Sequence, residues 1–450
     1  MNDFDIVLRG GAVVTDEYVV STDVAIAGGR IVAVEPEITG TAHEEIDATG
    51  LHVFPGVVDP HVHFNEPGRT EWEGWATGSR AFAAGGGTTC IEMPLNALPP
   101  TIDGPSFDAK QDAAAAQSMT DFALWGGLVP GNLDRLDELA ERGVVGFKAF
   151  MSQSGTPDFE AADDLTLYEG MARAARLGLI VAVHAESDII TSRLAMRAVA
   201  TGRTNVRDYL ASRPAIAELE AIGRAILFAD ETGCVLHIVH VSTGRGVALV
   251  TAARVRGVDV TCETCPHYLV FTEEDVEAIG ALAKCAPPIR SAMERNALWR
   301  RLESGEIAIV ASDHSPAPPA MKQSADFFQV WGGISGIQST LPLMLSEGHH
   351  GRGLPLSRIA EVTAANAARR FRLPSKGRIA PSFDADLVLV KLSAEHTPRP
   401  DDLHDRHRHS PYVGRTLRGR VVRTLLRGTT IYQNGAFVSA PVGRFVRPAG

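Results

Sequence analysis

One pattern repeats through the middle of the chain, from about residue 56 to residue 377. A short apolar run is followed each time by a stretch with the 3.6-residue periodicity of a helix. Such alternation predicts parallel βα units, and a few hundred residues suit a closed (β/α)8 barrel of the TIM type. A doubly wound open sheet is the alternative, but no Gly-x-Gly-x-x-Gly opens a helix after the first strand. The apolar runs span 56–63, 88–92, 122–128, 144–150, 179–184, 235–241, 259–264 and 307–312.

Both ends of the chain are rich in predicted strands. Near the N-terminus, Gly10-Gly11 and Gly28-Gly29 interrupt apolar runs, and near the C-terminus Arg427-Gly428 and Asn434-Gly435 do the same. Glycine turns between such runs are typical of hairpins. The runs are 5–9 and 12–15, 23–27 and 30–34, 421–426 and 429–432, and 436–438.

Neither end is long enough to hold a hydrophobic core alone. We therefore expect residues 1–55 and 378–450 to form one small β-sandwich domain, which the chain re-enters through residues 382–390. The barrel, residues 56–377, would be inserted between the two halves.

The formal net charge of −11 argues against a nucleic-acid or acidic-membrane partner. No apolar run reaches the roughly 18 residues that span a bilayer, and the N-terminus lacks a secretory pattern. Five cysteines without a framework spacing suit reduced thiols. We expect a cytoplasmic protein. Cys262 and Cys265 form a CxxC, but no second ligand pair completes a structural zinc site.

Metal-ligand side chains stand at the ends of several predicted strands. His61 and His63 are two residues apart, so in an extended chain their imidazoles face the same side and can reach one metal ion. His184, His240 and Asp313 end three other runs. The carboxyl ends of barrel strands form the active site, so we predict that these side chains meet there. We interpret His237, three residues before His240, as structural.

Lys148 lies inside the apolar run 144–150. A lysine that reaches solvent at the barrel rim is the alternative interpretation. Burial favours the neutral amine, which can react with carbon dioxide to give a carbamate, and this anion has two oxygens to bridge two cations. Beside four histidines and an aspartate, we favour the modified lysine.

This set of residues predicts metal-dependent hydrolysis. Two divalent metals about 3.5–4 Å apart would lower the pKa of a shared water and polarise the carbonyl under attack. Asp313 would accept the proton of the water and pass it to the leaving nitrogen. Histidine and carboxylate ligands suit zinc, and also cobalt, manganese or iron.

The residues around these ligands resemble the cyclic amidohydrolases, a family that includes dihydroorotases, hydantoinases or dihydropyrimidinases, and allantoinases. The resemblance covers nearly the whole chain. It implies a carboxylated Lys148 (N6-carboxylysine) that bridges two metals, one held by His61, His63 and Asp313, the other by His184 and His240. It also suggests a homotetramer. The matching motifs are His61-Val62-His63, Gly146-Phe147-Lys148, His184-Ala185-Glu186, His240-Val241-Ser242 and Ser312-Asp313-His314.

The stretches between the ligands look most like the allantoinases, which open the hydantoin ring of allantoin to give allantoate in purine degradation. The similar stretches of this chain are residues 65–69, 71–74, 91–96, 261–268, 284–290, 312–316, 331–336 and 410–415. Dihydroorotases carry an arginine for the substrate carboxylate where this chain has Asn65, and a neutral amide cannot replace that charge pair. They also usually place a histidine where this chain has Tyr268. An uncharged substrate agrees with both differences.

Four residues are candidate substrate contacts: Asn96, Ala286, Ser315 and Gly332. Hydantoinases carry an asparagine where this chain has Gly332, and a glycine would leave room for the ureido group of allantoin. Relatives commonly have serine at Ala286, and alanine is harmless there if the backbone does the binding. Asn96 could instead cap a loop.

Two alternatives to this function remain, and a third fails. A hydantoinase or dihydropyrimidinase shares the ligand set. A non-catalytic scaffold on the same fold is disfavoured because all six ligand positions are intact. A structural zinc protein would hold its ligands in one local, closed cage.

Overall fold

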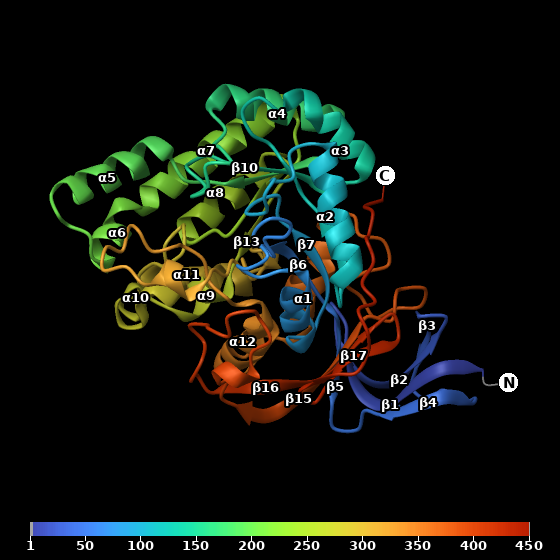
Figure 1. Ribbon diagram of the computed structural model, residues 1–450. Coiled ribbons are helices and arrows are strands. Elements are labelled where there is room, and N and C mark those ends of the chain that lie inside the picture. Colours follow the sequence, from blue (N-terminus) through green and yellow to red (C-terminus); the bar gives the residue numbers. More distant parts are fainter. Residues whose placement is uncertain (1–2, 450) are drawn as a thin grey trace.

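Short parallel strands form the centre of the molecule in the computed structural model, which describes residues 3–449 (Figure 1). The first three strands pair in the order β6-β7-β8, and the others form a sheet in the order β14-β13-β12-β11-β10-β9. The strands are β6 (Val57–Val62), β7 (Gly87–Glu92), β8 (Asp121–Leu124), β9 (Gly126–Gly127), β10 (Gly146–Phe150), β11 (Ile180–His184), β12 (Leu236–Ile238), β13 (Val260–Thr264) and β14 (Ile309–Val310).

Backbone contacts link the two groups of strands at both sides. The Val145 N–H donates to Leu124 O at 3.0 Å, between the β8 and β10 segments. At the other side, Val62 of β6 forms a parallel bridge with His314, just after β14, and the His63 N–H donates to His314 O at 2.8 Å. The predicted alternation is therefore confirmed as parallel strands that neighbour one another in chain order.

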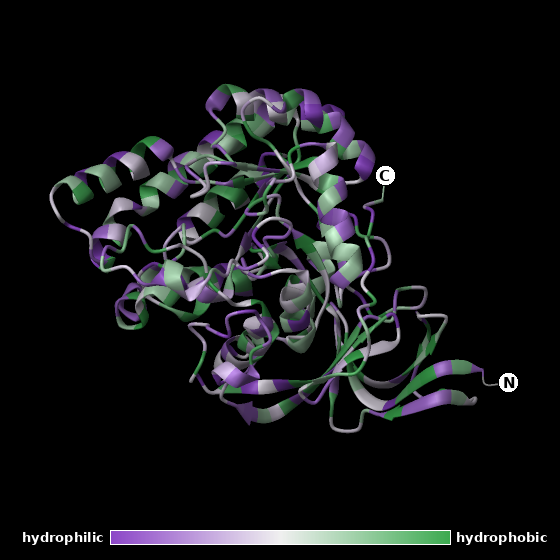
Figure 2. Ribbon diagram, viewed as in Figure 1, coloured by the Kyte–Doolittle hydropathy of each residue, from purple (hydrophilic) through white to green (hydrophobic). Residues whose placement is uncertain are grey.

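Helices follow the strands, as the periodicity predicted, and lie outside them in Figure 1. Figure 2 shows that many helices have one hydrophilic and one hydrophobic side, while the central strands are mostly hydrophobic. No helix within residues 3–449 has both the length and the hydropathy needed to cross a bilayer. The helices are α1 (Trp75–Ala84), α2 (Gly104–Gln117), α3 (Leu136–Arg142), α4 (Asp164–Arg176), α5 (Asp188–Ala200), α6 (Val206–Ser212), α7 (Ala215–Thr232), α8 (Gly244–Val255), α9 (Pro266–Val270), α10 (Glu273–Ile279), α11 (Ala292–Glu303), α12 (Thr340–Leu343), α13 (Leu356–Ala360) and α14 (Asn366–Arg370).

Strands from both ends of the chain share one sheet, in the order β18-β17-β16-β15-β5-β1-β2-β3, with β4 paired to β1. The ends meet where β5 pairs antiparallel with β15, and this sheet lies at the lower right of Figure 1. Its strands are β1 (Phe4–Val14), β2 (Val19–Ala27), β3 (Arg30–Glu35), β4 (Ala42–Asp47), β5 (His52–Pro55), β15 (Leu387–His396), β16 (Leu417–Leu426), β17 (Thr429–Gln433) and β18 (Ala436–Phe437).

One of the predicted hairpins is wrong. Residues 5–9 and 12–14 belong to the single strand β1, which pairs with β2 on both sides of Gly10-Gly11. The register shifts between Leu8 and Gly11, and Gly10 has a φ of 67°, so the glycine pair forms a bulge rather than a turn. The hairpins at Gly28-Gly29, Arg427-Gly428 and Asn434-Gly435 are confirmed, because β2 pairs with β3, β16 with β17 and β17 with β18.

A buried lysine joins the terminal sheet to the parallel strands. Lys376 is 3% exposed, and its Nζ lies 2.6 Å from Asp121 on β8, 2.8 Å from Asp386 and 2.9 Å from Asp384. Burial alone would lower the pKa of Lys376, but the three aspartates raise it. A charged ammonium therefore occupies the centre of this acidic group.

We expect Lys376→Met to lower the free energy of unfolding by ~3–5 kcal/mol, because it leaves buried carboxylates without their shared cation. Denaturant unfolding followed by circular dichroism would measure the change. Lys391 on β15 is an exposed lysine, and Lys391→Met is the matched control, with an expected change below about 0.5 kcal/mol. Equal stability of the two variants would contradict the assignment.

Candidate active site

His61, His63 and Asp313 converge where the β6 and β14 segments end. His61 Nε2 lies 3.2 Å and His63 Nε2 lies 3.5 Å from Asp313 Oδ1. The His63 Nδ1–H donates to Leu95 O at 2.9 Å, which leaves the lone pair of Nε2 directed at the aspartate. Burial opposes ionisation of Asp313, but His61 and its neighbouring imidazoles hold the pKa of Asp313 below its usual range.

A second carboxylate orients His61. Glu263, on β13, accepts from His61 Nδ1 at 2.5 Å and from His237 Nε2 at 3.0 Å. Thr261 Oγ lies 2.8 Å from the other nitrogen of His237. Burial alone would raise the pKa of Glu263, but His61 and His237 lower it to about 2. The carboxylate directs the His61 Nδ1–H away from the site, so that Nε2 presents a lone pair.

His184 and His240 form a second pair of donors. His184 Nδ1 lies 3.0 Å from His240 Nε2, and the His184 Nε2–H donates to Glu186 Oε2 at 2.9 Å. Arg213 pairs with the same carboxylate oxygen. Burial opposes ionisation, but Arg213 and His184 lower the pKa of Glu186 to about 2. Glu186 therefore fixes the His184 tautomer as Glu263 fixes that of His61.

The backbone is strained at two of these positions. His240 and Asp313 have φ values of 39° and 45°, in the left-handed region that side chains rarely adopt. Strained residues of this kind cluster at functional sites, where the surrounding structure holds them. At these two strand ends the conformation directs the side chains to their partners.

Lys148 lies in the middle of β10 and is fully buried. Its Nζ has no hydrogen-bond partner within residues 3–449 and lies 4.8 Å from the centroid of the Phe150 ring, which also stacks on His184. Burial lowers the pKa of Lys148 to about 7. The side chain does not reach solvent at the rim, so that alternative is excluded.

The donor atoms present fit a divalent metal. Atoms of His61, His63 and Asp313 lie within 4.8 Å of one another. The nitrogens and oxygens that face each other carry lone pairs, which repel unless a cation or a proton lies between them. Lys148 Nζ and His240 Nδ1 are further buried polar atoms without a partner in the described chain, and such atoms call for an explanation.

A cavity of about 460 Å³ opens over these side chains. The four predicted histidine ligands and Asp313 line it. Lys148 does not line it, but lies next to Phe150, which does. All four predicted substrate contacts line it as well: Asn96, Ala286, Ser315 and Gly332. The Asn96 side chain donates to Asn65 Oδ1 at 3.2 Å, so it both faces the cavity and braces a loop.

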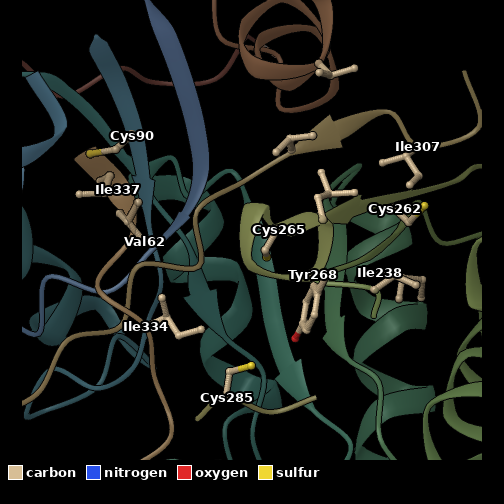
Figure 3. Packing of buried hydrophobic residues seen from close by; sticks show 14 of the residues in the cluster. Val62, Cys90, Ile238, Cys262, Cys265, Tyr268, Cys285, Ile307, Ile334 and Ile337 are labelled. Carbon is tan, nitrogen blue, oxygen red and sulfur yellow. The ribbon is translucent and has the colours of Figure 1, made fainter. Parts of the chain in front are cut away.

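Asn65 and Tyr268 are the two residues whose identity argued against a dihydroorotase. They do not line the cavity themselves. Asn65 contacts the cavity residue Asn96. The Tyr268 hydroxyl donates to Pro287 O at 2.6 Å, beside Ala286, and Figure 3 shows its ring packed among Cys265, Cys285 and Ile238. Both residues therefore act on the cavity through its wall.

At Gly332 an added Cβ would meet one atom within 4 Å, Cys285 Cα at 3.9 Å. A Cβ atom therefore meets no close contact at this position of the cavity wall. At Gly333 the same atom would clash with Ser315 O at 2.1 Å, so this glycine is required for close approach of the two cavity segments.

Sequence reasoning missed Glu263, Glu186 and Arg213. The signal for Glu263 was an acidic residue inside the apolar run 259–264, and that for Glu186 was its position two residues after His184. Arg213 gave no signal, because it lies between α6 and α7, far from the ligands in sequence.

His267, with both ring nitrogens unpartnered in the described chain, lies within 4.8 Å of Asp313 and Cys265. The five cysteines are buried and free.

Comparison with known proteins agrees with this geometry. Residues 52–431 match the sequence profile of the Amidohydrolase family. The chain is 65% identical over 448 residues to the allantoinase of Rubrobacter xylanophilus, covering 100% of this chain and 98% of that protein. It is 59% identical over 442 residues to the allantoinase of Solibacter usitatus, covering 98% and 96% of the two chains.

Solved structures show the same architecture. The L-hydantoinase (dihydropyrimidinase) of Arthrobacter aurescens superposes with a TM-score of 0.96 at 36% identity, over 99% of this chain and 100% of that one. The dihydropyrimidinase of Brevibacillus agri superposes with a TM-score of 0.91 at 30% identity, over 100% and 99%. The chain belongs to the Amidohydrolase family, and its parallel strands with an added β domain agree with the architecture of these solved structures.

We expect Glu263→Gln to weaken metal affinity or activity by about 10–100-fold, because an amide no longer holds the His61 proton as a carboxylate does. Competition with a metal-binding dye and elemental analysis would measure the loss. Glu220→Gln on α7 is the control, since Glu220 lies on the exposed side of that helix. Unchanged affinity and activity in Glu263→Gln would contradict the orienting role.

Proposed function

We propose that this protein hydrolyses the hydantoin-ring amide of allantoin to give allantoate, a step of purine degradation. The observation that carries the proposal is the convergence of the predicted ligands beneath a cavity that Gly332 leaves wide. Full-length identity of 65% and 59% to two allantoinases supports the same substrate.

The proposed site holds two divalent metal ions, with zinc as the first candidate. His61, His63 and Asp313 would hold one ion, and His184 and His240 the other. Lys148, as a carbamate formed with carbon dioxide, would supply one oxygen to each. When bound, the ions would acidify a water molecule and polarise the ring carbonyl.

The protein's own residues handle the proton in this proposal. Water adds to the ring carbonyl carbon, the carbon–nitrogen bond breaks, and one proton must move from the water to the departing nitrogen. Asp313 is ionised and 13% exposed at the cavity, so its carboxylate can accept that proton and then deliver it. Glu263 and Glu186 keep the imidazoles in the required tautomers.

The proposed substrate contacts are polar but largely uncharged. Ser315, Asn96 and the backbone around Ala286 and Gly332 offer donors and acceptors to a ring with several amide groups. The free space at Gly332 would receive the ureido group. An uncharged ring needs no arginine partner, which agrees with Asn65.

The proposal extends to the architecture and the assembly. We propose that the parallel strands close into a (β/α)8 barrel over residues 56–377, supported by the pairing of Val62 with His314. Residues 1–55 and 378–450 would form the satellite β domain. The homotetramer and the cytoplasmic location expected from the sequence belong to the same proposal.

A panel of substrates tests the assignment. We expect the purified, metal-loaded protein to show a kcat/KM for allantoin at least about tenfold above those for hydantoin, dihydrouracil and dihydroorotate. Hydantoin or dihydrouracil as the best substrate would replace the proposal with the hydantoinase alternative, which the structural neighbours represent. No turnover by a preparation that carries stoichiometric metal would contradict both.

The variant Gly332→Asn tests whether the absence of a side chain at this position of the cavity determines which substrate is preferred. Because a Cβ atom at Gly332 meets no close contact, we expect the variant to fold and to lose allantoin turnover about tenfold more than hydantoin turnover. Steady-state kinetics with both substrates measure the ratio. An unchanged ratio would remove Gly332 from the specificity argument while leaving the panel result intact.

A further inference from the structure

One wall of the cavity is formed by a long segment with little regular structure. Between β14 and the 3-10 helix η4 (Ile337–Ser339), its only helix is η3 (Pro319–Lys322), also a 3-10 helix. Val330, Trp331, Gly332 and Gly333 of this segment line the cavity. Backbone groups outside helices and sheets still need partners when buried, and two lysines supply many of them.

Lys284 contacts this segment from another part of the chain, since it directly follows the 3-10 helix η2 (Gly280–Ala283). Its Nζ donates to the carbonyl oxygens of Phe327 at 2.6 Å, Phe328 at 3.3 Å and Val330 at 2.5 Å. The same ammonium lies 4.5 Å from the centroid of the Tyr209 ring. Its own carbonyl accepts from the Gly333 N–H at 2.8 Å.

Lys322 acts from within the segment. Its Nζ donates to Gly333 O at 2.7 Å, Trp331 O at 2.8 Å and Ala281 O at 3.2 Å. The first two carbonyls flank Gly332, and the third belongs to η2. Lys322 thereby ties the Gly332 backbone to the stretch that carries Lys284.

Each lysine is matched to three acceptors, the number that an ammonium can satisfy. Within residues 3–449 the hydrogen bonds of both ammonium groups go to carbonyl oxygens, and neither group lies within 4.0 Å of a carboxylate oxygen. Burial lowers the pKa of both to about 7. Lys284 is buried and Lys322 is half-buried. A cation that exchanges water for carbonyl groups alone costs free energy, and packing alone would be served better by an apolar side chain.

We propose that Lys284 and Lys322 form a clamp that holds the Phe327–Gly333 backbone in position to bind the substrate. Lys284 itself lines the cavity, but the three donors of each ammonium group are directed at carbonyl oxygens rather than at the ligands of the metal site, so both act as positioning residues. A preformed wall reduces the ordering that binding would otherwise require. The inference rests on the proposed function for the identity of the substrate, an uncharged cyclic ureide.

The first test is Lys322→Met. We expect KM for the best substrate of the panel to rise about tenfold, with kcat within about twofold of the parent, because a disordered wall weakens binding. Metal content should be unchanged, since no ligand moves. Lys391→Met on β15 is the control. A parental KM, or a loss of kcat together with metal, would overturn the proposal.

The second test separates charge from packing. Lys322 is half-buried while the five native cysteines are buried, so a thiol introduced by Lys322→Cys can be alkylated selectively. Alkylation with 2-bromoethylamine restores an ammonium of lysine length, and 2-iodoethanol adds a neutral group of the same length. We expect the first reagent alone to restore KM. Equal recovery with both would show that the side chain only fills space.

Hydrogen exchange tests the clamp without any substrate. In Lys322→Met and Lys284→Met, peptides covering residues 327–334 should exchange faster than in the parent, while peptides covering β7 keep their protection. This readout stands even if allantoin is not the substrate, so it distinguishes failure of the clamp from failure of the proposed function. Parental exchange in both folded variants would overturn the clamp.

Discussion

The site depends on lone pairs that converge in a buried space. His61, His63 and Asp313 face one another at one side, and His184 Nδ1 faces His240 Nε2 at 3.0 Å at the other. Lone pairs that face one another in this way repel unless a metal ion or a proton lies between them. Glu263 and Glu186 maintain it, because each holds the one imidazole proton that would otherwise turn toward the centre. The strand ends and the strained conformations of His240 and Asp313 bring these side chains together. The cavity lies over them.

In the proposed site, the residues that would carry out hydrolysis and the residues that would bind the substrate lie on different parts of the chain. The residues that would hold the metals lie at the strand ends, whereas residues 328–333 line the cavity beside them and would contact the substrate. That wall has little regular structure and takes its order from side-chain ammonium groups. Changes in the wall can therefore alter the substrate without disturbing the strands that carry the ligands.

Much of the fold, and the convergence of the histidines and Asp313, could be predicted from sequence, because both follow from local patterns. His61 and His63 share a face by strand geometry, and His184 and His240 end apolar runs. Glu263 could not be assigned, since its partners His61 and His237 depend on which strands are neighbours. Gly10-Gly11 was misinterpreted because a glycine pair permits a bulge as readily as a turn. The roles of Lys284 and Lys322 could not be predicted, since their carbonyl partners belong to an irregular segment whose path local patterns do not define.

The most direct test of the account is anomalous diffraction from crystals of the metal-loaded protein. We predict two anomalous peaks about 3.5–4 Å apart. One should lie about 2.0–2.2 Å from ligand atoms of His61, His63 and Asp313, and the other about 2.0–2.1 Å from nitrogens of His184 and His240. Electron density that extends from Lys148 Nζ should reach both peaks. A single peak or none, with Lys148 ending at its amine, would contradict the two-metal site.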